Sequence, residues 1–373
     1  MREALAERLL ARVMEWTPED VARERPILQA MATFKYDEYQ QFSPGMRFVE
    51  SFALWLSQFK KKDERQIAYD FVKNRLVFCS DAEMSHFVSV AYPDYIRPLL
   101  VRHAAETLHI PERNIIKITA SHEYRMLRRQ CLFLGLSDGA RIDIFRRNTP
   151  ELSHEQIWQT YEMSTEKAKD IHDKLQIDLA SLSGTASTID TPLFRMVFLL
   201  DDFSGSGVTY LRKDETTGEF AGKISKFFEQ LKRKESGLGS LVSLSDLHIG
   251  IVIYMATEKS RLRLEEMLDT LFEKDKIAWS IHMIQILGDE VTLSDTVDGS
   301  FLKLEDSYFD ENANDIHSLV GGGDYKRGFG QGSLPLVLSH NTPNNSVFLL
   351  WADAEKYKTR GLFPRISRHR STS

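Results

Sequence analysis

Residues 196–209 read MVFLLDDFSGSGVT, a strand-like run that leads directly into two acids and a loop of small and hydroxyl residues. The apolar run 196–200 is typical of a strand that is covered on both faces in a parallel sheet. Asp201 and Asp202 follow at its C-terminal edge, where two carboxylates can accept hydrogen bonds from the two hydroxyls of a ribose. An ordinary strand-to-loop junction would account for the apolar run and the glycines. It would not account for both acids and three hydroxyls in one place.

The loop that follows the acids has the composition of an anion-binding bend. Its glycines permit a close approach of the backbone and unusual φ values, and its hydroxyls come from Ser204, Ser206 and Thr209. We expect this turn to open a helix, whose N-terminus would add partial positive charge. With the two acids, the loop predicts a pocket for a ribose 5-phosphate.

This stretch resembles the signature of the phosphoribosyltransferase superfamily, in which an apolar strand, an acidic pair and two variable residues precede a Gly-rich loop that ends in Thr. The match runs from Val197 to Thr209, although Gly205 and Val208 are not the family's commonest residues. The resemblance implies a type I phosphoribosyltransferase-like α/β fold in which Asp201 and Asp202 are catalytic and bind ribose. It also implies that the whole motif binds ribose phosphate: Asp201, Asp202, Ser204, Gly205, Ser206, Gly207, Val208 and Thr209.

The composition is that of an ordinary soluble globular protein. The chain has 373 residues, of which 42% are hydrophobic and 27% charged, enough for a large core in one or two domains. A net charge of −6 argues against a surface that binds nucleic acid throughout. Neither a signal peptide nor an apolar run of ~18 residues is recognisable, so we expect a cytoplasmic protein without membrane contact. Cys79 and Cys131 lie in apolar runs and are expected to be buried thiols, with a disulfide as the alternative.

Strand-like and helix-like segments alternate along the chain, which predicts a mostly parallel sheet with helices on both faces. We expect an N-terminal helical region at 1–73, a phosphoribosyltransferase-like core at 74–290, and a C-terminal cap with a glycine-rich loop and a basic tail at 291–373. Ligands of such sheets bind beyond the carboxyl ends of the strands, where the two acids would lie.

Short apolar runs mark the expected strands. They are 76–79, 114–118, 131–136, 142–145, 196–200, 248–256 and 277–287, followed by 334–338 and 346–351. An amphipathic helix is expected over 260–272, and Thr17 followed by Pro18 is a helix-start signal. The polar, helix-prone excursion 153–191 lies where the family has its closing loop, and its small residues 181–187 suit a flexible segment.

Residues 137–141, Ser-Asp-Gly-Ala-Arg, are a candidate for the pyrophosphate site. A tight turn at Asp138 and Gly139 can present backbone amides, and the guanidinium of Arg141 can bind pyrophosphate in a bidentate manner. The same Asp-Gly pair also favours a hairpin turn between the flanking apolar runs. Both interpretations stay open.

Two further pairs are candidates for substrate contacts. Ser80 and Asp81 follow the first predicted strand. His340 and Asn341 lie in a turn between the last two apolar runs, where they can cap a pocket and contact a base or an acceptor. The basic tail 356–370 is either a solvated end or a contact for a phosphate backbone or an acidic partner protein.

Several other motifs are rejected. Residues 218–223 read GEFAGK, which is one residue short of a P-loop and is followed by Ile224 instead of Ser or Thr. Residues 310–321 begin like a calcium loop but lack its Gly and its Glu. No Cys and His spacing indicates zinc.

Over about residues 30–355 the chain resembles the phosphoribosyltransferase-like proteins of bacterial conflict, or anti-phage defence, systems (PRTase-CE-like). The stretches that carry this resemblance are 198–207, 136–141 and 340–351. It implies binding of phosphoribosyl pyrophosphate (PRPP) or a nucleotide ligand, and transfer or hydrolysis of the phosphoribosyl group with Mg²⁺ bound mainly through the substrate. It also implies a partner protein such as an NTPase or a reverse transcriptase, and leaves contact with nucleic acid open.

Two alternatives to an enzyme follow from the same fold. One is a non-catalytic nucleotide or phosphoribosyl sensor that acts with a partner protein, by analogy with regulators of this fold. The other is a structural subunit with a degenerate pocket. Release of pyrophosphate from PRPP would separate an enzyme from both.

Overall fold

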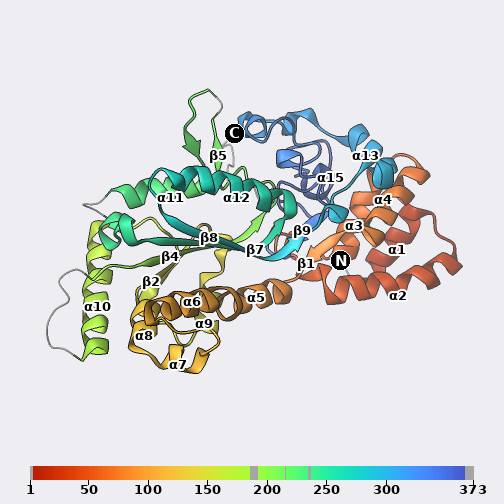
Figure 1. The fold of residues 1–373 in the computed structure, drawn as a ribbon. Coiled ribbons are helices and arrows are strands. Elements are labelled where there is room, and N and C mark those ends of the chain that lie inside the picture. The colour runs from red at the N-terminus through yellow and green to blue at the C-terminus, as the bar shows by residue number, and fades with distance from the viewer. Residues whose placement is uncertain (1–2, 185–191, 215, 234–236, 366–373) are drawn as a thin grey trace. The chain divides into compact units, whose positions relative to one another are not determined.

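The computed structural model of the chain describes residues 3–184, 192–214, 216–233 and 237–365. The chain forms two compact units (Figure 1). Unit 1 consists of residues 1–83 and 288–373, and unit 2 of residues 84–287. In the sequence, unit 2 therefore interrupts unit 1.

Unit 2 is built around a five-stranded sheet in which all neighbouring strands are parallel. Its strands, in spatial order, are β3 (Ile157–Trp158), β2 (Cys131–Gly135), β4 (Met196–Ser204), β7 (His248–Thr257) and β8 (Ala278–Leu287). Leu134 of β2 lies opposite Leu199 of β4, although β3 separates these two strands in the sequence. The predicted mostly parallel α/β fold is confirmed.

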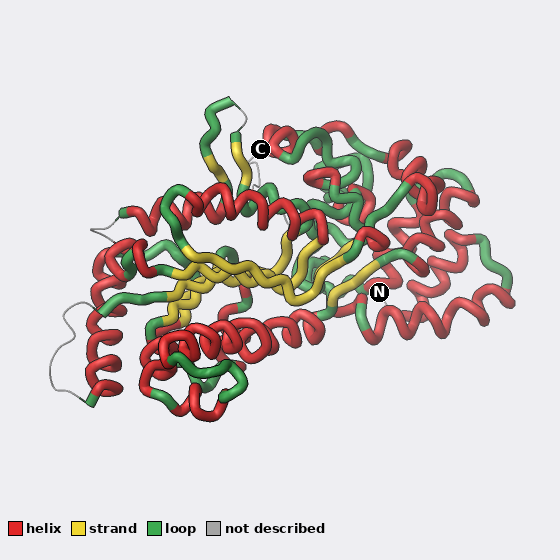
Figure 2. The backbone as a smooth tube through the Cα atoms, viewed as in Figure 1, coloured by secondary structure: helices red, strands yellow, loops and turns green. Residues whose placement is uncertain are grey.

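Helices cover both faces of this sheet (Figures 1 and 2). Leu132 and Leu134 of β2 belong to a core that is shared with α10 (Thr165–Ser183), α11 (Lys223–Lys232) and α12 (Glu258–Glu273). Phe133, which lies between them on the strand, points to the opposite face because side chains alternate along a strand. There it stacks on Phe198 at a centroid distance of 5.3 Å and packs beside Phe145. This second face is covered by helices that include α6 (Arg97–Leu108) and α9 (Ile142–Asn148).

The remaining elements of unit 2 are short. Residues 91–96 form a π-helical segment before α6. Two short helices precede β2, and a small antiparallel hairpin follows β4. These elements are α7 (Ile115–Ala120), α8 (His122–Arg129), β5 (Arg212–Lys213) and β6 (Phe220–Ala221).

Unit 1 combines helices with a two-stranded parallel sheet of β1 (Val77–Cys79) and β9 (Leu336–Leu338). Its N-terminal helices are α1 (Glu3–Met14), α2 (Pro18–Phe34), α3 (Phe48–Ser57) and α4 (Lys62–Asn74), and its C-terminal helices are α13 (Asp295–Tyr308), α14 (Ile316–Val320) and α15 (Phe348–Trp351). The boundary with unit 2 falls within α5 (Asp81–Val90). The helical N-terminal region is confirmed, and the hydroxyl of Thr17 caps α2 by accepting a hydrogen bond from the N–H of Asp20 at 3.2 Å.

Three predicted strands are wrong. Residues 114–118 contribute to α7, residues 142–145 begin α9, and residues 346–351 end in α15. In α9 the buried residues are Ile142 and Phe145, which are three positions apart and therefore share a face of a helix. The hairpin alternative for residues 137–141 is wrong for the same reason, because Asp138–Ala140 is a 3₁₀ turn that leads into this helix.

Three further predictions concern the cysteines, membrane-spanning segments and flexible segments. Cys79 and Cys131 are free, buried thiols, as predicted. Within the part of the chain that the structure describes, no helix is long and apolar enough to cross a membrane. Of the predicted flexible segment 181–187 and the basic tail 356–370, residues 185–187 and 366–370 lie outside the described residues.

Candidate functional site

The two acids lie where the strand order of the unit 2 sheet changes direction. β2 ends at Gly135, opposite Leu200, whereas β4 continues beside β7 as far as Ser204. From β2 the chain moves outward to β3 and then returns to β4 on the other side of β2. Loops that leave such a pair of strands in opposite directions open a crevice at the carboxyl edge, which is where ligands of α/β sheets bind. Asp201 and Asp202 are the first residues of β4 beyond the end of β2.

The carboxylate of Asp201 is completely buried and has partners on both oxygens. Its Oδ2 accepts a hydrogen bond from the Lys223 ammonium at 2.6 Å. Its Oδ1 accepts hydrogen bonds from the Ser137 hydroxyl and from the N–H of Asp202, the latter at 3.2 Å. Burial raises the pKa of Asp201, the positive charge of Lys223 opposes that rise, and the negative charge of Asp202 adds to it.

Asp202 is half-buried and faces the turn that follows β2. Its Oδ1 accepts a hydrogen bond from the N–H of Phe203 at 2.8 Å. A Cβ atom at Gly139 would lie 2.1 Å from its Oδ2. Glycine is therefore required at position 139 for this placement of the carboxylate. The carboxylate of Asp202 therefore lies against the turn at residues 138–140, which is the predicted pyrophosphate site.

Two buried tyrosines surround the acids. The hydroxyl of Tyr210 donates to the carbonyl of Phe203 at 2.9 Å, and that of Tyr254 donates to the carbonyl of Ala140 at 2.8 Å. Burial, followed by the negative charges of Asp201 and Asp202, raises the pKa of both hydroxyls. The charge of Arg141 lowers the pKa of Tyr254. The turn after β2, with Gly139 and Arg141, therefore lies beside the two acids of β4.

The bend at residues 204–209 packs against the first turn of α12. The Ser204 and Ser260 hydroxyls are 2.6 Å apart, and the Thr257 hydroxyl donates to the Gly205 carbonyl at 2.7 Å. Gly207 has a φ of +73°, and a Cβ there would lie 3.3 Å from the side chain of Arg263. Residues 205–208 are buried, with Ser206 only 4% exposed, and Thr209 is exposed.

The backbone amides of this bend are unpaired. Among the residues that the structure describes, the N–H groups of Ser206, Gly207, Val208 and Thr209 donate to no protein acceptor. The hydroxyls of Ser206 and Thr209 likewise have no hydrogen-bond partner within the described ranges. Such a run of free donors can bind an anion.

The prediction that the bend opens directly into a helix is wrong. The turn at 208–210 leads into the β5–β6 hairpin, and α11 begins only at Lys223. Two backbone hydrogen bonds still join the bend to this helix, from Lys223 N–H to the Thr209 carbonyl at 3.1 Å and from Ile224 N–H to the Tyr210 carbonyl at 3.0 Å. The helix start therefore lies beside the bend in space, although not next to it in sequence.

The two remaining pairs of candidates lie together in unit 1. Ser80 and Asp81 follow β1, while His340 and Asn341 follow β9, and these strands are parallel neighbours. Ser80 caps α5, because its hydroxyl accepts a hydrogen bond from the Glu83 N–H at 3.1 Å. All four residues therefore belong to unit 1, whereas the acids and the bend belong to unit 2.

Two cations of the site, Lys223 and Arg263, were not predicted from the sequence. Lys223 was dismissed with the failed P-loop motif, yet it forms the ion pair with Asp201. Arg263 of α12 lies beside Gly207, and its buried Nε has no hydrogen-bond partner among the described residues. No local sequence signal distinguishes either cation. The tertiary fold brings Lys223 of α11 and Arg263 of α12 to the site from distant parts of the sequence.

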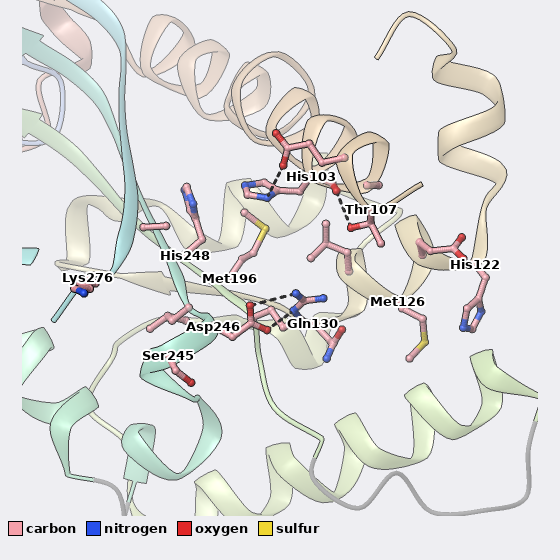
Figure 3. Close-up of a pocket in the computed structure, with 17 residues that line it drawn as sticks. His103, Thr107, His122, Met126, Gln130, Met196, Ser245, Asp246, His248 and Lys276 are labelled. Carbon is pink, nitrogen blue, oxygen red and sulfur yellow. Dashed lines mark hydrogen bonds and ion pairs between the residues drawn. The ribbon is translucent and has the colours of Figure 1, made fainter. Parts of the chain in front are cut away.

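A pocket lies at the amino edge of the same sheet, opposite the edge that carries the acids (Figure 3). This pocket of about 590 Å³ is lined by the first residues of β4, β7 and β8, among them Met196 and His248. His248 is 9% exposed, its Nε2 is 2.9 Å from the Ser280 hydroxyl, and its Nδ1 has no partner in the described part of the chain. The ring of His103 lies 5.3 Å away. Burial, followed by the charges of His103 and His282, lowers the pKa of His248 to about 4.

We expect His248→Phe to reduce the loss of stability in acid. The pKa of His248 falls from 6.5 to about 4 on folding. The neutral imidazole therefore contributes fully to the free energy of unfolding above about pH 6.5. This contribution, of up to about 3 kcal/mol, is lost as the pH falls towards 4. Urea unfolding of wild type and variant across this range measures the difference. His122→Phe, at an exposed histidine of the same pocket, is the control. Parallel pH profiles of wild type and His248→Phe would contradict the expectation.

The region that contains the acids and the bend is similar to a known protein family. A family model described as PRTase-CE matches residues 53–365, which include the acids, the bend and the turn at 137–141. No curated protein and no solved structure matches the chain. Within the described residues, no group of three or more His, Cys, Asp or Glu side chains is placed to hold a metal ion.

Proposed function

The chain belongs to the PRTase-CE family, and on this premise we propose that it binds PRPP or a related ribose 5-phosphate ligand at the carboxyl edge of the unit 2 sheet. One observation carries the proposal: four successive N–H groups, from Ser206 to Thr209, lack an acceptor among the described residues on a mostly buried bend. Buried N–H groups are rarely left unpaired in proteins, so this bend is suited to the 5-phosphate. Arg263 adds positive charge beside it.

The chemistry that we propose is cleavage at C1 of the ribose. The bond between C1 and the pyrophosphate oxygen breaks, and water or another acceptor adds to C1 and loses its proton. The acids would stabilise the positive charge that develops on the sugar, with Asp202 contacting the ribose hydroxyls. Arg141 and the N–H groups of Asp138 and Gly139 would contact the pyrophosphate. Mg²⁺, bound mainly through the substrate's own oxygens, would neutralise charge on the leaving group.

We also propose a place for the protein in bacterial anti-phage defence, beside a partner such as an NTPase or a reverse transcriptase. The alternative of a non-catalytic sensor has one observation in its favour. The carboxylate of Asp201 is already occupied by Lys223 and Ser137. A pocket with one acid so engaged can recognise a ligand without turning it over.

Calorimetric titration with PRPP and MgCl₂, together with an assay for released pyrophosphate, tests the proposal. Binding with release of pyrophosphate supports the enzyme, and binding without release supports the sensor. Ribose 5-phosphate and inorganic phosphate are the matched ligands that separate recognition of the sugar from recognition of any anion. If the wild-type protein binds neither PRPP nor ribose 5-phosphate, the proposed function is wrong.

We expect Gly139→Ala to lower PRPP affinity by about tenfold or more while changing the free energy of unfolding by less than about 1 kcal/mol. The new Cβ would lie 2.1 Å from Asp202 Oδ2, so the carboxylate must move, whereas the backbone of the turn can stay. Gly299→Ala, at a glycine of α13 with nothing within 4 Å of the new atom, is the control and should leave the affinity unchanged. Wild-type affinity in Gly139→Ala would separate Asp202 from the ligand.

A further inference from the structure

We infer that Lys223 and Asp201 form a charge clamp that positions the ligand-binding elements, and that Asp202 is the acid of the pair that contacts the ligand. This inference rests on the proposed function and departs from the equal roles that the sequence motif implies for the two acids. Lys223 is a residue of the rejected P-loop motif, and its clamp role comes from the structure alone.

The oxygens of Asp201 are already occupied by protein donors. Three groups from three elements bind its two oxygens: the Ser137 hydroxyl after β2, the Asp202 N–H of β4 and the Lys223 ammonium at the start of α11. The side chain is completely buried. A ribose hydroxyl would have to displace an ammonium from a buried carboxylate, exchanging a charge-assisted hydrogen bond for a weaker neutral one.

Lys223 connects the acids to the bend at residues 204–209. Its ammonium bonds Asp201 at 2.6 Å and lies 4.8 Å from the centre of the Tyr210 ring. Its N–H donates to the carbonyl of Thr209 at 3.1 Å. Tyr210 in turn donates its hydroxyl to the carbonyl of Phe203, next to Asp202. One lysine thereby touches the buried acid, the end of the bend and the tyrosine that spans them.

The two acids differ in burial and in surroundings. Asp202 is only half-buried, and its carboxylate lies against Gly139 of the turn after β2. Asp202 is therefore the more exposed of the two acids at the carboxyl edge of the sheet, where a ligand is expected. Asp201 points into the protein and holds its neighbour's backbone through the Asp202 N–H.

The test is a double-mutant cycle on the full chain, with Lys223→Met, Asp201→Asn and the combined variant. Lys223→Met leaves a buried carboxylate without its cation, so we expect its melting temperature to fall by about 5 °C or more and its PRPP affinity by about 20-fold. The combined variant removes the uncompensated charge and should recover most of both losses. Asp202→Asn should lose affinity at an unchanged melting temperature.

A pH profile adds a measurement that a purely packing role would not affect. Without Lys223, the carboxyl of Asp201 should take up a proton more readily, so the loss of stability caused by Lys223→Met should shrink as the pH is lowered. The other charged or titratable groups around Asp201 are Asp202, Tyr210, Tyr254 and Arg141. All of them are retained in both proteins, so the comparison isolates the clamp.

The outcomes separate this inference from the proposed function. If the combined variant binds PRPP as poorly as Asp202→Asn, then Asp201 contacts the ligand and the inference is overturned. A Lys223→Met protein with the wild-type melting temperature overturns it as well. If the wild-type protein binds no PRPP, the proposed function and the ligand contact of Asp202 both fail. The coupling between Lys223 and Asp201 in the stability cycle still decides whether the clamp exists.

Discussion

The Asp201→Asn/Asp202→Asn double variant is expected to lose PRPP binding by about 100-fold or more while remaining folded. Hydrogen bonds to an ionised carboxylate contribute about 1.5–3 kcal/mol, and tenfold in affinity corresponds to about 1.4 kcal/mol. The loss of the more exposed acid, Asp202, together with the loss of Asp201, which positions it, therefore reaches this magnitude. The variant leaves the Lys223 ammonium without its partner, but the side chain of Lys223 is 22% exposed and can be hydrated, so we expect the fold to persist.

Calorimetry with PRPP and MgCl₂ measures the affinity, and the unfolding transition checks the fold. Asp246→Asn is the matched control, because this acid lies at the opposite edge of the same sheet in an exposed ion pair with Arg195. It should bind PRPP like the wild type. A double variant that binds as tightly as the wild type would show that the acids are not the ligand site.

Gly222→Ala is expected to lower the free energy of unfolding by about 3 kcal/mol or more. Gly222 has φ +121° and ψ −176°, a conformation that is open essentially to glycine alone and costs other residues about 1–3 kcal/mol. The added Cβ would also lie 2.5 Å from the carbonyl oxygen of Tyr210, a backbone atom that cannot move away easily. Since Lys223 is the next residue, PRPP affinity should fall as well.

The control for this variant is Gly218→Ala in the nearby β5–β6 turn. Gly218 also has a positive φ, of +71°, but the only contact near its added Cβ would be the Lys213 side chain at 4.0 Å. Gly218→Ala should lower the free energy of unfolding by only about 1 kcal/mol. Denaturant unfolding of the two variants side by side measures the difference. Equal stabilities would mean that the close approach of Gly222 to Tyr210 is not as tight as described.

The predicted fold succeeded where an apolar run is long or is covered on both faces. The runs at 196–200 and 248–256 became the central strands β4 and β7. Residues 114–118 failed because β-branched residues favour a strand, but Ile115 and Ile116 are exposed and only Ile118 of α7 is buried. Residues 346–351 failed for the opposite reason. Their complete burial leaves no periodicity by which helix and strand can be told apart.

The candidate site was predictable only in its local part. Asp201, Asp202 and the bend form one contiguous stretch, so composition and spacing were enough to group them. The ion pair with Lys223 depends on the hairpin β5–β6, which returns the chain to the acids over 22 residues. The placement of Arg263 depends on the pairing of β7 with β4 and on the start of α12. Such contacts are set by the tertiary fold and leave no pattern in the local sequence.

The interruption of unit 1 by unit 2 has a consequence for how the protein is made. A ribosome delivers the N-terminal helices and β1 long before β9, the partner strand of β1, leaves the exit tunnel. During that interval every strand of the parallel sheet emerges, so the interior part of the chain can complete its fold first. The apolar faces of α3 and α4 stay uncovered until α13 and α15 have been synthesised, because residues of all four helices share one core.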